Sequence, residues 1–100
     1  MRKSFDDDLL RWLREVSLAQ ALQALGLHVA VDREFVPVKD GRTERWIVSV
    51  GAGTCELLVT GLKWYDTRDR RGGGGAIDLV MHLEGLDFVQ AVRRLSAAMG

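Results

Sequence analysis

The chain has few of the residues that metal-binding and disulfide-linked domains are built from. Its 100 residues include one cysteine, Cys55, and two histidines, His28 and His82. One cysteine cannot form an internal disulfide, and a Cys-rich zinc site with four ligands needs more thiol and imidazole groups than these. We therefore expect no metal and no cofactor, unless an oligomer supplies further zinc ligands.

Long apolar runs and net charge are also missing. No apolar segment approaches the roughly 20 residues of a membrane-spanning helix, and the N-terminal residues lack a signal-like apolar stretch. We therefore expect a cytoplasmic protein with no membrane partner. The 14 basic and 14 acidic side chains cancel, so overall charge neither favours nor excludes nucleic acid. The 47% hydrophobic content predicts one small domain over residues 1–100.

Both ends of the sequence have the apolar spacing of amphipathic helices. Residues 5–25 predict two short helices or one bent helix, the first capped by Ser4 with Asp7 and the second by Ser17. A third helix is expected to begin near Ala76.

Glycine and aspartate mark the end of that helix and the start of another. Gly85 is a helix-stop residue, and Asp87 with Gln90 forms a capping-box pattern ahead of a final helix. Two C-terminal helices are therefore predicted.

The middle of the chain has strand periodicity instead. We predict three or four antiparallel strands, in the segments EFVPVK (34–39), RWIVSV (45–50), CELLVTG (55–61) and LKWY (62–65). Pro37 would place the first of these at a sheet edge, and Asp40-Gly41 is a hairpin-type turn signal. The predicted fold class is α+β, with N-terminal helices, a small antiparallel sheet and two C-terminal helices.

The segment KWYDTRDRRGGGG joins cations, aromatic rings and bare backbone just before a helix. Guanidinium groups pair with phosphate oxygens, and glycine N–H groups at a helix N-terminus can approach an anion. Aromatic rings beside basic side chains are typical of sites that hold single strands. The predicted nucleic-acid contacts are Lys63, Trp64, Tyr65, Arg68, Arg70, Arg71, Gly72, Gly73, Gly74 and Gly75.

The same segment has a simpler interpretation. Four glycines can form a flexible turn, and the arginines can be merely solvated. The glycine run matches neither the Walker pattern nor a dinucleotide-binding fingerprint, so it does not by itself indicate a nucleotide.

No catalytic residues can be nominated. The acidic run at residues 6–8 could hold Mg²⁺, but consecutive helix positions point in different directions, so helix capping is the better interpretation. Cys55 lies in an apolar strand and is interpreted as a structural thiol, whereas His28 and His82 stand alone in the sequence. The chain is therefore expected to lack an activity of its own.

Residues 74–96 resemble the N-terminal zinc-binding domain of bacterial replicative primases. The matching positions are Gly75, Ala76, Ile77, Asp78, Phe88, Ala91, Val92 and Leu95, and residues 17–27 are similar to that family's leading helix. The family's Cys-x-x-Cys positions fall at Arg68 and Arg71, and its earlier ligand pair falls near residues 45–49, where no ligand stands. The chain thus looks like a zinc-less relative of the kind found with toprim domains in plasmid and mobile-element primase-like proteins.

The resemblance implies a function and leaves an alternative open. It implies an accessory domain that binds single-stranded DNA in a replication or mobilisation protein, beside a toprim or primase catalytic domain in the same or another chain. It also implies that packing, with Trp46 and Trp64 as candidates, replaces the metal. The alternative is a protein-docking module that uses the sheet face or the helix face of Arg93 and Arg94. A small enzyme acting on a nucleotide phosphate is a third class, but the sequence offers no base or nucleophile.

Overall fold

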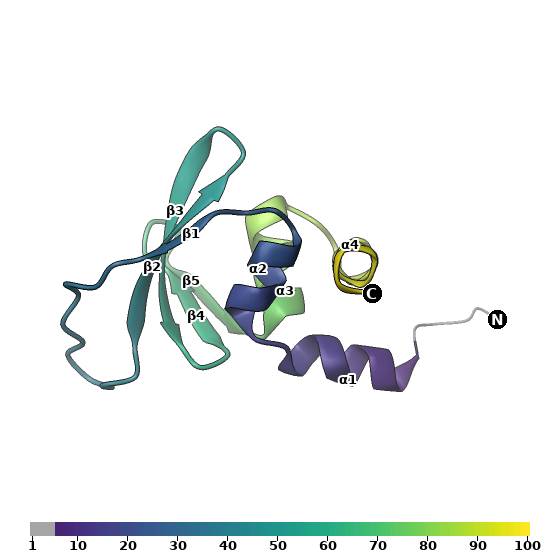
Figure 1. Ribbon diagram of the computed structural model, residues 1–100, viewed down its shortest axis with the longest axis horizontal. Coiled ribbons are helices and arrows are strands. Elements are labelled where there is room, and N and C mark those ends of the chain that lie inside the picture. Colours follow the sequence, from purple (N-terminus) through teal and green to yellow (C-terminus); the bar gives the residue numbers. More distant parts are fainter. Residues whose placement is uncertain (1–5) are drawn as a thin grey trace.

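The sheet and the helices form two layers, with all the helices on one face of the sheet (Figure 1). The computed structural model describes residues 6–100, in which there are four helices and five strands. They are α1 (Asp7–Glu15), α2 (Leu18–Ala24), β1 (Val29–Val31), β2 (Glu44–Val50), β3 (Gly53–Thr60), β4 (Lys63–Asp66), β5 (Arg71–Gly74), α3 (Ala76–Glu84) and α4 (Phe88–Met99). The predicted α+β class is confirmed, but the sheet has five strands instead of the three or four expected.

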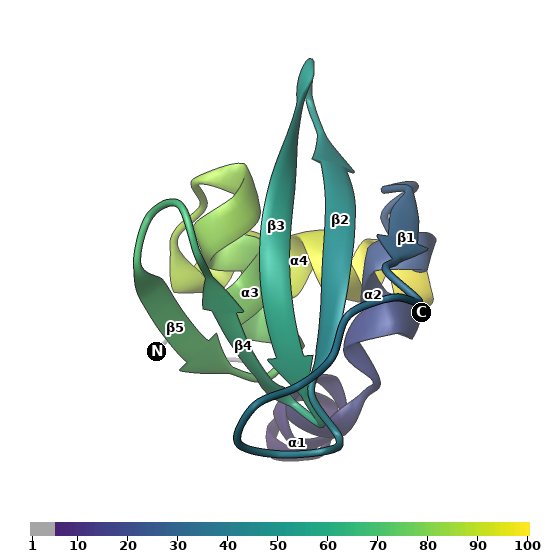
Figure 2. The same ribbon diagram turned by 90° about the vertical axis from the view of Figure 1, so that its left-hand side faces the viewer.

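The sheet is a simple antiparallel meander in the order β1-β2-β3-β4-β5 (Figure 2). The prediction of a strand at residues 34–39 is wrong, because this segment lies in the loop between β1 and β2. Its Val36 and Val38 side chains are 79% and 95% exposed, and Pro37 has no N–H to donate to a ladder. The first strand is instead Val29–Val31, which pairs with Trp46–Val48 of β2.

Side-chain caps fix the helix ends much as the sequence indicates. The Ser17 hydroxyl accepts the N–H of Gln20 at 3.0 Å, and Asp87 and Gln90 form the predicted capping box of α4. The predicted cap at Ser4 lies outside the described residues. At the start of α1 the Asp6 carboxylate accepts the N–H of Asp8 at 2.9 Å, so this acidic run caps a helix.

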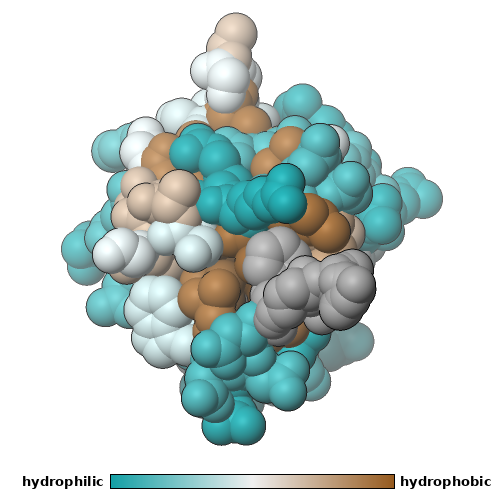
Figure 3. Space-filling view, turned by 90° about the vertical axis from the view of Figure 1, so that its right-hand side faces the viewer, coloured by the Kyte–Doolittle hydropathy of each residue, from teal (hydrophilic) through white to brown (hydrophobic). Residues whose placement is uncertain are grey.

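The core lies between the inner face of the sheet and the helices. The sheet contributes Trp46, Val48, Leu57, Val59 and Trp64, and the helices contribute Leu13, Leu18, Leu22, Leu79, Val80, Val92 and Leu95. Both candidate packing tryptophans are therefore core residues. On the side of the molecule that carries the helices, hydrophilic residues surround smaller hydrophobic areas (Figure 3).

The glycine run is a strand rather than a turn. Gly72, Gly73 and Gly74 pair with β4, and only Gly75, with φ +84°, acts as the N-cap of α3. A Cβ on Gly73 would lie 1.9 Å from a carboxylate oxygen of Asp78 and 2.8 Å from the Trp64 ring. Gly73 is thus required by the close approach of β5 to a buried indole.

This crowding predicts that Gly73→Ala destabilises the protein whereas Gly74→Ala does not. The Gly73 methyl group would overpack the site at a cost of about 1–3 kcal/mol. At Gly74 a Cβ meets nothing nearer than 4.0 Å, so the free energy of unfolding should change by less than about 1 kcal/mol. Urea unfolding of the two variants provides the measurement, and equal stabilities would contradict the packing argument.

Candidate functional site

The outer face of the sheet is left open by the helices and carries an apolar groove. A groove of about 630 Å³ lies between the β1–β2 loop and the outer face of β3 and β4. Its lining includes two aromatic rings, Phe35 and Tyr65, and two cations, Lys39 and Lys63. In Figure 2 this face is toward the viewer, and the β1–β2 loop crosses one end of the sheet. A flat ring could enter this groove with cations beside it.

Neighbouring residues of β4 point to opposite faces of the sheet, so the nucleic-acid contacts predicted in this strand do not all lie on one face. Tyr65 is 42% exposed on the outer face, but Trp64 points inward and is only 3% exposed. The Trp64 ring stacks on His82, with the ring centroids 5.1 Å apart. The expectation that both rings are available to a ligand on one face is therefore corrected, since neighbouring strand residues point to opposite faces.

The three predicted arginines lie together at one end of the sheet. Arg68 and Arg70 belong to the turn between β4 and β5, and Arg71 begins β5. All three are exposed, and in residues 6–100 none of them forms an ion pair. Their guanidinium groups are therefore available to an external anion.

Two of the predicted backbone donors already have acceptors. The N–H of Gly74 donates to the Asp78 carboxylate at 3.0 Å, and that of Gly75 donates to the Leu62 carbonyl at 2.8 Å. An anion at the start of α3 would have to compete with these bonds. Gly72, Gly73 and Gly74 mainly form part of strand β5, and they place no side chains on the outer face of the sheet.

Arg45, by contrast, is neutralised on the outer face. Its guanidinium contacts the carboxylates of Glu56 and Asp32, and Glu56 also accepts the Thr67 hydroxyl. The hydrogen bonds from Thr67 and Arg45 lower the pKa of Glu56. This network ties β2 to β3 and to the β4–β5 turn.

The lowered pKa gives a pH dependence. Because the Glu56 carboxylate is favoured in the folded state, its stabilising contribution is complete above the ordinary glutamate pKa and is lost as pH falls through the folded pKa. Glu56→Gln should therefore weaken the acid dependence of unfolding between about pH 5 and pH 3. Denaturation curves across this range test it, and parallel curves for wild type and variant would exclude the contribution.

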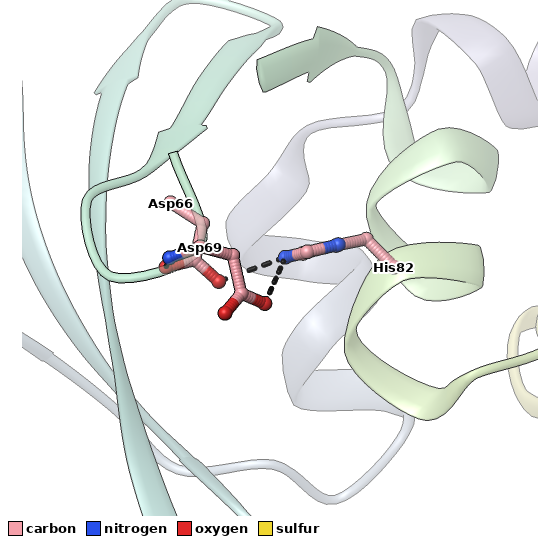
Figure 4. Close-up of side chains that lie close together, drawn as sticks. All are labelled: Asp66, Asp69 and His82. Atoms are coloured by element: carbon pink, nitrogen blue, oxygen red, sulfur yellow. Dashed lines mark hydrogen bonds and ion pairs between the residues drawn. The ribbon is translucent and has the colours of Figure 1, made fainter. Parts of the chain in front are cut away.

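A second group of polar side chains gathers beneath the arginine turn. His82 of α3 points toward Asp66 and Asp69 (Figure 4), with its Nε2 2.8 Å from Asp66 and 3.6 Å from Asp69. The Cys55 thiol donates to Asp66 at 3.3 Å. The sequence suggested an isolated histidine, but His82 contacts two carboxylates, those of Asp66 and Asp69. These two aspartates were not recognised as a pair from the sequence.

Asp66 organises this group and the turn above it. One of its oxygens accepts the N–H groups of Arg68 and Asp69, at 3.0 and 3.2 Å, and the other faces His82 and Cys55. Burial alone would raise the pKa of Asp66, but the hydrogen bonds from His82, the two amides and Cys55 outweigh it and lower the pKa. Asp66 is therefore a buried carboxylate whose charge is well compensated.

Cys55 is not an activated nucleophile. Burial and the neighbouring Asp66 carboxylate raise its pKa to about 12. A thiol that stays protonated at neutral pH is a poor nucleophile. This agrees with the interpretation of Cys55 as a structural residue.

Comparison with known proteins gives a partial match. The "65 kDa protein" of Zymomonas mobilis subsp. mobilis is 41% identical over 44 residues, which are 44% of this chain and 8% of that protein. The matched segment is therefore less than half of this chain and a small part of that relative. No protein-family model matches the chain, and no solved structure matches it. Within residues 6–100, every helix is too short or too polar to cross a membrane.

Asp66 should be far more important for stability than Asp69. Asp66→Ala removes the acceptor of two turn amides and of His82, and should cost about 2–4 kcal/mol. Asp69→Ala removes a largely exposed carboxylate and should cost less than about 1 kcal/mol. Unfolding in buffer containing a metal chelator measures both, and equal losses would contradict the organising role of Asp66.

Proposed function

We propose that this domain binds single-stranded DNA across the outer face of its sheet, as an accessory domain of a primase-like replication or mobilisation protein. The main support is the groove on that face, which combines the Phe35 and Tyr65 rings with Lys39 and Lys63. Bases stack on aromatic rings whatever their sequence, and cations beside the rings hold the phosphates. A duplex keeps its bases stacked inside, so such a groove suits a single strand.

The arginines of the β4–β5 turn extend the proposed path. Arg68, Arg70 and Arg71 are exposed cations without carboxylate partners among the described residues, and they follow directly from the strand that carries Lys63 and Tyr65. Phosphates leaving the groove along β4 would meet them. A locally basic end on a neutral domain can therefore bind a polyanion.

The accessory role rests on two observations of a different kind. Residues 74–96 resemble the primase finger, and the matched segment of the Zymomonas protein lies within a much longer chain. A toprim or primase catalytic domain, in the same or another chain, would then supply the chemistry. Trp46 and Trp64 would provide the packing that keeps such a finger folded.

The proposal predicts salt-dependent binding that depends on Tyr65. Labelled single-stranded DNA should bind more weakly at about 200 mM than at about 50 mM salt, because phosphate contacts release counterions. Tyr65→Ala should weaken binding about 5- to 150-fold through lost stacking, whereas Tyr65→Phe should retain it. Fluorescence anisotropy measures each affinity.

The arginines are tested by the slope of affinity against salt. Replacing Arg68, Arg70 and Arg71 with alanine should reduce this slope by about 2, whereas Arg93→Ala, an exposed change on α4, should leave it unchanged. No binding at low salt, or unchanged binding by the Tyr65 and arginine variants, would favour the docking alternative. The exposed Val36 and Val38 beside the groove would then be the first residues to test for a protein contact.

A further inference from the structure

Four metal-ligating side chains from four parts of the fold gather beneath the arginine turn. Cys55 comes from β3, Asp66 from the end of β4, Asp69 from the β4–β5 turn and His82 from α3. One ligand atom from each of Asp66, Asp69 and His82 lies within 4.8 Å of the other two, and the Cys55 sulfur is 3.3 Å from Asp66. Figure 4 shows both carboxylates directed at the imidazole.

The separations known among these atoms are close to those of a tetrahedral site. Metal–ligand bonds of about 2.0–2.3 Å separate neighbouring ligand atoms by about 3.3–3.7 Å. The observed separations are 3.3 Å for Cys55–Asp66, 3.6 Å for His82–Asp69 and 2.8 Å for His82–Asp66. The last contact, a hydrogen bond in its present form, has to open by about 0.5 Å. The Cys55 sulfur adjoins Asp66 but lies outside the group of three, so it has to move toward His82 and Asp69 to complete the site.

We infer that Cys55, Asp66, Asp69 and His82 form a binding site for one zinc ion. A thiolate, an imidazole and two carboxylates are together the donor set of a borderline-soft ion, and the Cys55 thiol would release its proton to solvent as the ion binds. Magnesium and calcium prefer oxygen ligands alone, so sulfur and nitrogen in the set argue against them. The count of cysteines and histidines in the sequence did not indicate this site, because half of its ligands are aspartates.

The surroundings hold these ligands in place. The side chains of Asp66 and His82 are 5% and 9% exposed, so neither samples many positions. Two backbone N–H groups fix one oxygen of Asp66 and leave the other for the ion, while the Trp64 ring packs against the His82 imidazole. Such outer contacts orient metal ligands and strengthen the site.

Charge and access also favour a cation. Two carboxylates face one imidazole, and the group lines a hollow of about 230 Å³ on the surface, which an ion can enter. Arg68 lines the same hollow, so the two carboxylates have to outweigh one exposed cation there. Asp69 lines this hollow and is 61% exposed, so an ion can reach its carboxylate directly. The site faces away from the groove that carries Tyr65, so the inference does not depend on the proposed nucleic-acid binding.

The test uses the whole chain purified without a metal-affinity tag and stripped with a chelator. Zinc titration should give one ion per chain, and zinc should raise the melting temperature. Cobalt should give intense visible bands of tetrahedral geometry together with a thiolate-to-cobalt absorption in the near ultraviolet. Cys55→Ser should remove the thiolate absorption specifically.

Asp69→Asn is the decisive variant. Because the Asp69 side chain is exposed, this change should not disturb folding, and a loss of zinc binding can be attributed to the lost ligand. The variant should weaken zinc binding at least about tenfold. Asp8→Asn, the same change at an exposed carboxylate of α1, should bind like wild type. Absence of saturable binding, a cobalt spectrum without thiolate absorption, or wild-type affinity in Asp69→Asn would each overturn the inference. DNA binding measured separately on the metal-free chain distinguishes failure here from failure of the proposed function.

Discussion

The alternation of β4 is the constraint on which both sites depend. Its four residues point alternately outward and inward, so Lys63 and Tyr65 reach the open face while Trp64 and Asp66 enter the interior. Strong apolar contacts fix this register, because Trp64 packs beneath β5 and against His82. A shift by one residue would bury Lys63 and Tyr65 and expose the indole, at a prohibitive cost. The outer groove and the inner polar cluster are therefore two consequences of one strand.

The lack of side chains on the glycines of β5 explains how the buried carboxylate of Asp66 can lie at the end of β4. A strand with side chains opposite Trp64 would push β5 away from α3, and Gly73 avoids this. The turn from β4 to β5 is then short enough for Asp66 to accept two of its amides. Those bonds, together with His82, compensate the carboxylate charge and make its burial tolerable.

Elements determined by local sequence were predicted well. Ser17, Asp87 and Gly85 act as caps and stops because capping depends on residues within one helical turn, and β2 to β4 have clear alternation. The sequence does not predict β5, because a strand made mostly of glycine has no side-chain pattern. Its strand character comes from its backbone pairing with β4, which is visible only in the structure. The segment 34–39 has the composition of a strand because its valines are β-branched, but Val36 and Val38 are 79% and 95% exposed and the segment forms a loop.

The grouping of Cys55, Asp66, Asp69 and His82 could not be predicted locally, because it requires the sheet and α3 to pack in one particular way. Alternation did carry a partial signal, since it places Asp66 on the same face as Trp64 and hence in the interior. A buried aspartate needs partners, and a helix that packs on that face can supply a histidine. Such reasoning indicates that a polar group exists but not which residues complete it.

The two sites meet in the turn of residues 67–70. Arg68 and Arg70 are exposed while Asp69 lies 3.6 Å from His82, so one short segment carries both these cations and a carboxylate of the inner cluster. Asp66 already holds this turn through two of its amides, and a ligand that also bound Asp69 would restrain the turn, and with it the arginines, further. Ordering a binding segment in advance lowers the entropy that its ligand must overcome, so the inner cluster could strengthen phosphate binding without touching a phosphate. Thermodynamic linkage makes this coupling reciprocal, since an anion held by the arginines would restrain Asp69 over His82 to the same degree.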